Sequence, residues 1–232
     1  MADAPVTLIT GTSRGIGRFL AAHFLAAGHH VIGCSREMAD CSPEGYEHFA
    51  LDVADESSFG PLLDHLRRQG RLDHLINNAA VASMNHSLLV PAETFTAVMQ
   101  TNVLGTFLFS REAARLMRRR RQGRIVNLAT TAIPLKLEGE APYVASKAAV
   151  VMLTEVLARE LAPLGVTVNA VGPGPLDTDL TRGVPREKLD RLLARHAITR
   201  QSTYEDVANV IDFFLAPASR QVTGQTVYLG GP

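Results

Sequence analysis

The chain has 232 residues, enough for one sizeable core, with 46% hydrophobic and 20% charged residues. Its 23 Lys and Arg balance its 23 Asp and Glu, which argues against a basic surface for nucleic acid or anionic lipid. Two cysteines, Cys34 and Cys41, show no metal-ligand or redox spacing, and Cys34 reads as a core residue. The sequence shows no signal segment and no run of about 18 apolar residues, so we expect a cytoplasmic protein without a membrane segment.

Short apolar runs alternate with longer stretches of helical periodicity. In the first such stretch Ile16, Leu20 and Phe24 share one helix face, and Gly28 follows as a stop signal. Strands are expected at residues 6–10, 31–34, 46–51, 74–77, 124–128, 167–171 and 226–229. Several are continuously apolar, as parallel strands buried on both faces are. The pattern predicts one α/β domain over residues 1–232, a Rossmann-type doubly wound parallel sheet of about seven strands with helices on both faces.

Two segments interrupt this alternation. Residues 37–45 are polar and include Pro43, so this connection is expected to lack a full helix. Residues 179–203 carry a weak helical pattern around 187–194 after the sixth strand. An insertion there would overhang the carboxyl ends of the strands, where open α/β sheets bind ligands. It is either a substrate lid or a surface helical excursion, and His196 within it is a candidate for substrate contact.

A glycine-rich turn joins the first expected strand to the first helix. Glycines allow a sharp turn and let backbone N–H groups approach a pyrophosphate at the helix N-terminus. The candidate cofactor-binding residues in the turn are Gly11, Ser13, Arg14, Gly15, Ile16 and Gly17. The spacing differs from G-x-G-x-x-G and resembles the T-G-x-x-x-G-x-G turn of short-chain dehydrogenases.

The end of the second strand bears on cofactor choice. An acidic residue there would bind the adenosine ribose and repel a 2′-phosphate, but this chain has Ser35 followed by Arg36. Arg14 is a second guanidinium that could reach the same phosphate, and a planar guanidinium can donate two hydrogen bonds at once. The pattern favours NADP(H) over NAD(H).

Tyr143 and Lys147 form a Tyr-x-x-x-Lys pair just after Pro142, a residue favoured at a helix start. Residues four apart share a helix face, and a nearby cation favours tyrosinate, which would lower the pKa of the phenol. Such a pair could serve proton exchange near neutral pH, although the motif alone also suits an amphipathic surface helix.

The order of further motifs resembles the short-chain dehydrogenase/reductase family along essentially the whole chain. Asn102, Thr130, Tyr143 and Lys147 match its Asn-Ser-Tyr-Lys catalytic tetrad, and Thr130 precedes Tyr143 by 13 positions. The resemblance also carries cofactor contacts over to a group of matching positions: Asp52, Val53, Asn78, Ala79, Tyr143, Lys147, Pro173, Gly174 and Thr178. It implies hydride exchange with a carbonyl, with Tyr143 as proton donor, Lys147 on the nicotinamide ribose and Asn102 holding a water chain.

Two positions depart from the family pattern. Ala80 replaces a usual Gly, adding a methyl group near the expected cofactor site. Thr130 replaces the catalytic Ser, and it keeps a hydroxyl donor while its β-branch restricts χ1. We expect Thr130 to act in place of Ser. Thr131 is adjacent, but neighbouring strand residues tend to face opposite ways.

Within the family the chain is most similar to 3-oxoacyl-(acyl-carrier-protein) reductases. Arg118 to Arg121 stand where that group carries a basic carrier-docking patch, although cations at a helix C-terminus are often simply solvated. Leu164 replaces a second expected basic residue, which weakens the case for carrier docking and leaves a free small ketone or a polyketide-like intermediate open as the substrate. The eight histidines show no close ligand motif, so no metal is expected.

Two other functions stay open: an alcohol dehydrogenase working oxidatively, and a weakly catalytic NADP(H)-binding sensor or scaffold. The arginines disfavour the first, and the intact Tyr143–Lys147 pair disfavours the second. The resemblance further implies a homo-oligomer, a tetramer or dimer, formed through helices at residues 101–118 and 143–161 and through the C-terminal segment.

Overall fold

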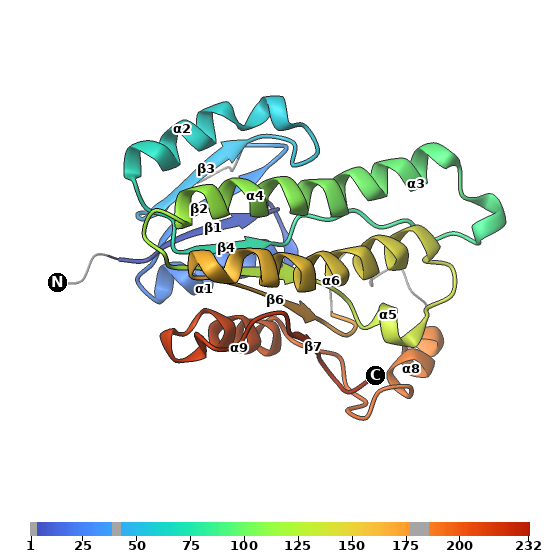
Figure 1. The fold of residues 1–232 in the computed structure, drawn as a ribbon. Helices are drawn as coiled ribbons and strands as arrows, with labels where there is room; N and C mark the ends of the chain where they lie inside the picture. Colours follow the sequence, from blue (N-terminus) through green and yellow to red (C-terminus); the bar gives the residue numbers. More distant parts are fainter. Residues whose placement is uncertain (1–3, 39–42, 177–185) are drawn as a thin grey trace.

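The computed structural model describes residues 4–38, 43–176 and 186–232. It contains one seven-stranded parallel sheet in the order β3-β2-β1-β4-β5-β6-β7 (Figure 1). The strand order reverses between β1 and β4, where doubly wound sheets open a crevice at the carboxyl ends of their strands. The strands are β1 (Val6–Thr10), β2 (His30–Ser35), β3 (Tyr46–Ala50), β4 (His74–Asn77), β5 (Gly123–Leu128), β6 (Val166–Gly172) and β7 (Thr226–Tyr228).

Helices cover both faces of this sheet. The α-helices are α1 (Gly15–Ala26), α2 (Gly60–Gln69), α3 (Ala92–Met99), α4 (Gly105–Met117), α5 (Ala132–Leu135), α6 (Ala141–Leu161), α8 (Arg186–Leu193) and α9 (Tyr204–Leu215). Short 3₁₀ turns are η1 (Glu56–Phe59), η2 (Ser87–Leu89), η4 (Ala162–Leu164) and η5 (Pro217–Ser219), and η3 (Gln100–Leu104) is a π-helical turn. Fold class, strand number and parallel arrangement are therefore as predicted from the sequence.

The alternation of side chains along each strand divides the core into two layers. In β1, Leu8 packs in the layer beneath α2, α4 and α6, whereas Ile9 packs in the layer beneath α1 and α9. Both side chains are at most 2% exposed. Burial of the strands on both faces explains why they are continuously apolar in the sequence.

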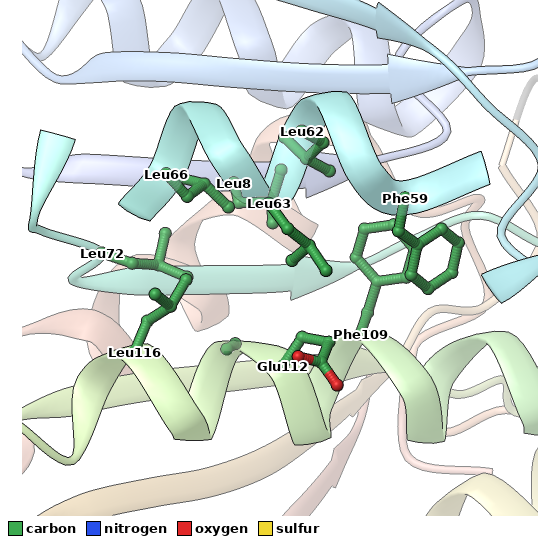
Figure 2. Close-up of a pocket in the computed structure, with 10 residues that line it drawn as sticks. Leu8, Phe59, Leu62, Leu63, Leu66, Leu72, Phe109, Glu112 and Leu116 are labelled. Carbon is green, nitrogen blue, oxygen red and sulfur yellow. The ribbon is translucent and has the colours of Figure 1, made fainter. Parts of the chain in front are cut away.

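Packing between α2 and α4 leaves a small apolar hollow (Figure 2). Leucines of α2, Phe59 and Phe109 line it, and Glu112 lies at its rim with its carboxylate turned outward. No predicted catalytic or cofactor residue lines this hollow, so it belongs to the core.

The boundaries differ from expectation mainly around residue 100. The helix expected at 101–118 is the second half of a longer helical run, because α3 begins at Ala92 directly after Pro91 and continues through η3 into α4. The described residues of the β2–β3 connection, 36–38 and 43–45, contain no helix, as expected. Within the expected lid, residues 179–185 lie outside the described part, and α8 accounts for the helical pattern.

One helical stretch, Ala141–Leu164, would pass as a membrane span on length and composition, with a mean hydropathy of 1.3. A core helix passes the same test. In this fold the stretch packs beside β5 and β6, and its inner side chains include the ammonium-bearing Lys147, so we assign it to the core.

Candidate active site

The glycine-rich turn lies at the carboxyl end of β1, beside the end of β2. The backbone N–H groups of Gly11 and Thr12 donate to the Cys34 carbonyl at 2.8 and 3.2 Å, which fixes the turn against β2. A Cβ at Gly17 would stand 2.2 Å from the Gly11 carbonyl oxygen, so only glycine allows this close approach. Within residues 4–38, 43–176 and 186–232, no side chain caps the first turn of α1, and Ser13 and Arg14 are exposed beside it.

Asn78 and Ala79 follow β4 directly and hold the same turn from the other side. Asn78 Nδ2 donates to the carbonyl oxygens of Thr10 and Gly11 at 2.9 and 3.0 Å. The N–H groups of Asn78 and Ala79 both donate to Thr10 Oγ1 at 3.0 Å. Ala80 is exposed, so its additional methyl group is not forced into the packed interior.

The loop after β3 carries Asp52 and Val53. Asp52 is exposed, and one of its oxygens accepts a hydrogen bond from the Ala54 N–H at 2.9 Å. Val53 is buried and lines a small hollow together with Thr10, Ala79 and Gly105. The structure thus brings Val53 and Ala79, which are far apart in the sequence, to one place beside the glycine-rich turn.

The end of β2 carries Ser35, which is nearly buried, and Arg36, which is exposed. Ser35 Oγ donates to the Glu37 carbonyl at 2.7 Å and lies 3.0 Å from His48 Nε2. The hydroxyl is therefore already engaged, and the exposed Arg36 is the better placed of the two for a phosphate.

A polar chain beneath this region was missed from the sequence. Tyr46 Oη donates to Thr12 Oγ1 at 2.9 Å and lies 2.7 Å from His48 Nδ1. The tyrosine passes over Gly33, where a Cβ would stand 2.2 Å from its hydroxyl. Tyr46 and His48 are two positions apart on β3 and therefore share a face of the sheet. The sequence alone does not show which residues contact that face.

Tyr143, Lys147 and Thr130 come together beyond the end of β5. Tyr143 lies in the first turn of α6, and its hydroxyl is hydrogen-bonded to the Thr130 side chain. Thr130 Oγ1 also accepts from the Ala132 N–H at 3.2 Å. Lys147 Nζ lies 6.0 Å from the centre of the Tyr143 ring and donates to the Leu128 carbonyl at 2.6 Å. Three of the four predicted tetrad residues thus form one group.

The electrostatics of this group differ from the sequence-based expectation. Burial, and after it the charge of Glu140, raise the pKa of Tyr143 to about 12, although the hydrogen bond from Thr130 acts in the opposite direction. Burial lowers the pKa of Lys147 to about 8. The expected lowering of the Tyr143 pKa is therefore not found in this structure, because burial and Glu140 dominate. Glu140, whose own pKa is raised by burial, was not singled out from the sequence.

Asn102 lies in the π-helical turn η3 and is completely buried. Its Nδ2 donates to the Val81 carbonyl and to Ser146 Oγ, both at 2.9 Å, and its Oδ1 accepts from the Val81 N–H at 2.9 Å. The side chain therefore clamps the segment after β4 to α6, one residue before Lys147. π-turns inside α-helices occur frequently at functional sites.

The segment after β6 approaches the same group. The Pro173 carbonyl accepts from the Thr131 N–H at 3.0 Å, and Gly174 follows beside Ser202 and His196. Thr178, the third predicted residue of this segment, lies outside the described residues.

His196 is buried, with Nε2 3.3 Å from Thr131 Oγ1 and Nδ1 3.1 Å from the Leu192 carbonyl. Thr131 is buried as well, and its hydroxyl contacts His196. Arg195 donates to the Leu135 carbonyl, which ties the end of α8 to α5 (Figure 1). The C-terminal part of the expected lid thus contacts the segment that carries Thr130.

The arginine patch lies elsewhere. Arg118 to Arg121 follow the C-terminal end of α4 and lead into the start of β5, so they lie at the amino edge of the sheet. The tetrad lies at the carboxyl edge, roughly 20 Å away along α4 at 1.5 Å per residue. Arg121 is further occupied by the Pro163 carbonyl, to which its Nη2 donates at 2.9 Å.

Comparisons with known proteins agree with this geometry. The family model described as enoyl-(acyl carrier protein) reductase matches residues 11–231. The 3-oxoacyl-[acyl-carrier-protein] reductase FabG of Staphylococcus aureus (strain Mu50) is 34% identical, covering 97% of this chain and 96% of that protein. The FabG of Escherichia coli (strain K12) is 30% identical, covering 99% of this chain and 97% of that protein.

Solved structures give the same result. The ligand-free aldohexose dehydrogenase of Thermoplasma acidophilum superposes with a TM-score of 0.90 at 28% identity, covering 98% of this chain and 93% of that one. ElxO with NADP bound gives a TM-score of 0.89 at 28% identity, covering 97% of each chain. A short-chain dehydrogenase from Leptospira borgpetersenii with bound NAD+ gives 0.89 at 25% identity, covering 98% of this chain and 92% of that one.

Fold, site and comparisons define an oxidoreductase that depends on a nicotinamide dinucleotide. The chain belongs to the short-chain dehydrogenase/reductase family, and the two curated relatives described above are 3-oxoacyl-[acyl-carrier-protein] reductases.

Proposed function

We propose that this protein reduces a ketone, a 3-oxoacyl thioester or a related carbonyl, to a secondary alcohol with NADPH. The observation that carries the proposal is the Tyr143 hydroxyl, hydrogen-bonded to Thr130 and placed beside the buried ammonium of Lys147. All three lie at the carboxyl edge of the sheet, on the same edge as the glycine-rich turn. Catalytic groups and a dinucleotide can therefore meet in one crevice.

The residues around the turn fit a dinucleotide. The first turn of α1 has no side-chain cap, so its N–H groups can receive a phosphate, and Gly17 allows the close packing beneath it. Arg36 is exposed at the end of β2 and Arg14 in the turn, and no carboxylate replaces Ser35 to repel a 2′-phosphate. Asp52, Val53, Asn78, Ala79, Pro173, Gly174 and Thr178 are the further residues proposed to contact the cofactor.

In the proposed mechanism each residue has one task. The bound cofactor supplies the hydride for the carbonyl carbon. Tyr143 donates its phenolic proton to the carbonyl oxygen as negative charge develops there, and Thr130 Oγ1 donates a second hydrogen bond to that oxygen once its single proton turns away from Tyr143. Lys147 must release the Leu128 carbonyl, or share its three protons, to reach the nicotinamide ribose. Asn102 keeps Val81 and α6 in place, and its proposed role in a water chain would use groups outside its present hydrogen bonds.

Whether an acyl carrier protein delivers the substrate is a more specific question than the reaction itself. The arginine patch lies at the sheet edge opposite the tetrad, so a carrier docked there would not face the crevice of the same protomer. We therefore propose a free small thioester or ketone as the first substrate to test.

Assembly into a homo-oligomer is proposed from the surface of two helices. Large apolar side chains are exposed on the η3–α4 run and on α6, namely Leu104 (42%), Phe107 (37%), Met152 (58%) and Val156 (44%). These are the helices expected from the sequence to form an interface. We also propose a cytoplasmic location, because the buried free thiol of Cys34 suits a reducing compartment.

The test is a cofactor-oxidation assay. NADPH and NADH absorbance would be followed with acetoacetyl thioesters, small diketones and aromatic ketones, for the wild type and for Tyr143→Phe. We expect turnover with NADPH that falls by about 10²-fold or more in the variant, because the proton donor is lost. Cofactor binding by the variant, followed by fluorescence titration, should be unchanged. Tight NADPH binding without turnover of any ketone would instead favour a sensor.

The oxidative direction has one observation in its favour, the high structural similarity to a protein named aldohexose dehydrogenase. The same assay run with NADP+ and NAD+ on secondary alcohols and aldohexoses decides between the two directions. Faster oxidation with NAD+ than reduction with NADPH would overturn the proposed direction and the proposed roles of Arg14 and Arg36.

A further inference from the structure

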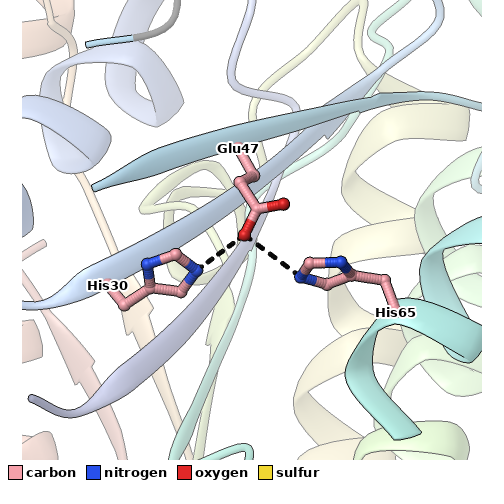
Figure 3. Close-up of side chains that lie close together, drawn as sticks. All are labelled: His30, Glu47 and His65. Carbon is pink, nitrogen blue, oxygen red and sulfur yellow. Dashed lines mark hydrogen bonds and ion pairs between the residues drawn. The ribbon is translucent and has the colours of Figure 1, made fainter. Parts of the chain in front are cut away.

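Three potential metal ligands meet at the edge of the sheet, away from the active site. His30 begins β2, Glu47 lies in β3 and His65 lies in α2 (Figure 3). His30 Nε2 lies 2.9 Å and His65 Nε2 3.1 Å from the same carboxylate oxygen, Glu47 Oε1. One ligand atom from each residue lies within 4.8 Å of the other two.

The fold explains why these residues meet although the sequence shows no ligand motif. Glu47 pairs with Ile32 across the β2–β3 ladder, and His30 lies two residues before Ile32, so both side chains point to one face of the sheet. Helix α2 covers that face with Leu62 and Leu66, and His65 shares their side of the helix. The histidines and the glutamate are therefore directed into one seam.

The spacing suits a small divalent ion. Zinc binds imidazole nitrogen and carboxylate oxygen at about 2.0–2.2 Å, which places tetrahedral ligand atoms roughly 3.3 Å apart. The two separations from Glu47 Oε1, 2.9 and 3.1 Å, are within a few tenths of an ångström of this value, and the ligand atoms of all three residues lie within 4.8 Å of one another. Side-chain exposures of 29% for His30, 38% for Glu47 and 18% for His65 leave the group reachable from solvent.

Hydrogen bonding alone does not satisfy the cluster. His65 Nε2 is buried and makes no hydrogen bond of acceptable geometry, although Glu47 Oε1 is close. His30 Nε2 lies 2.9 Å from Glu47 Oε1 and 3.1 Å from Gln69 Nε2, and Gln69 Nε2 also donates to Glu47 Oε1 at 3.4 Å. Glu47 Oε1 is therefore the shared centre of the group. A cation between the three groups would receive both imidazole lone pairs and the carboxylate charge at once.

We propose that His30, Glu47 and His65 bind one divalent transition-metal ion of the zinc class, with a fourth position open to water. Two imidazoles and one carboxylate suit zinc, nickel or copper better than magnesium or calcium, which prefer all-oxygen sites. The ion would fasten α2 to β2 and to the edge strand β3. His30 lies at the start of its strand, on the opposite edge from Tyr143, so the ion takes no part in the reaction.

The experiment uses tag-free, full-length protein freed of metal with a chelator and dialysed. Zn²⁺ affinity is measured by competition with a chromophoric chelator, and Co²⁺ is added as a spectroscopic probe. We expect one ion per chain, visible Co²⁺ bands of four-coordinate intensity, and a higher melting temperature with Zn²⁺. His65→Gln and His30→Gln should each weaken binding by at least about tenfold, whereas His86→Gln, at an exposed position, should not.

Two results would overturn the proposal. One is the lack of stoichiometric Zn²⁺ uptake by the wild type, and the other is equal uptake by His65→Gln and wild type. Glu47→Gln, which keeps the size of the side chain, provides a second variant if either histidine variant unfolds. Circular dichroism and NADPH binding of each variant distinguish loss of the metal site from loss of the fold.

Discussion

Glu140, the N-cap residue of α6, lies three positions before Tyr143, and its negative charge raises the pKa of the Tyr143 phenol. A carboxylate beside the proton donor keeps the phenol protonated to higher pH. This relationship makes Glu140 a positioning residue of the proposed reaction, acting on Tyr143 by charge and not by contact with substrate.

Replacing Glu140 by Gln should lower the pKa of Tyr143. Reduction needs the protonated phenol, so activity falls as the pH rises through this pKa, and the variant should lose activity at lower pH than the wild type. The measurement is kcat/KM for ketone reduction against pH with saturating NADPH. Glu138→Gln, at an exposed position in the same segment, is the control and should leave the profile in place. An alkaline limb that stays fixed or moves upward in Glu140→Gln would contradict this role.

Replacing Thr130 tests whether its hydroxyl serves in place of serine. Thr130→Val keeps the shape but removes the hydrogen bond to Tyr143, and kcat should fall by about 10²–10³-fold, as for loss of one oxyanion donor. Thr130→Ser keeps the hydroxyl and removes the methyl group, so kcat should be equal or higher, with the larger gain for bulky ketones.

Thr131→Ser is the matched control for the serine variant, because Thr131 faces His196 instead of the site. Similar kcat values for Thr130→Val and wild type would remove Thr130 from the mechanism.

Replacing Arg36 by Ala should weaken NADPH selectively. A charge-assisted hydrogen bond contributes about 1.5–3 kcal/mol, so KM for NADPH should rise roughly 10- to 100-fold while KM for NADH stays nearly constant. The control is Arg18→Ala, because Arg18 is also an exposed arginine but lies on α1. Parallel changes for both cofactors would show that Arg36 does not recognise the 2′-phosphate.

The acid stability of the fold should depend on His74. Burial, followed by the charge of His29, lowers the pKa of His74 to about 4 from 6.5. The folded state therefore favours neutral His74, and its contribution is complete above pH 6.5 and is lost as the pH falls from 6.5 to about 4. The loss amounts to at most about 3.5 kcal/mol at 1.4 kcal/mol per pKa unit.

Urea unfolding at several pH values between 7 and 4 measures this effect. His74→Gln should show a flatter decline in the free energy of unfolding than the wild type, and His86→Gln, at an exposed position, should match the wild type. Equal slopes for His74→Gln and wild type would assign the acid sensitivity to other groups.

Most of the fold could be predicted because each strand is marked in the sequence by a short apolar run. The strands at 6–10 and 74–77 were predicted with their observed bounds, and each of the others differs by one residue at one end or at both ends. Continuous apolar runs of this kind are typical of parallel strands whose two faces are both covered by helices. Helix α3 was missed because its eight residues merge through a π-turn into α4, and π-turns leave no periodic signal in the sequence.

The tetrad could be placed by its order along the chain, but its electrostatics could not. Glu140 and the degree of burial decide the pKa of Tyr143, and both depend on how α6 packs. Tyr46, His48, and the cluster of His30, Glu47 and His65 escaped notice for a related reason. Their members are brought together by the β2–β3 register and by α2, not by short spacing along the chain.

The π-helical turn at Gln100–Leu104 has a consequence for the orientation of the site. One additional residue in a turn advances everything beyond it by about 100° around the helix axis. The rotation of α4 relative to α3 about the helix axis is therefore set by the π-turn and not by the lengths of the two helices. Asn102 points inward and donates to Ser146, whereas Leu104, two residues later, points outward and is 42% exposed. Lengthening either half by whole turns would preserve both directions.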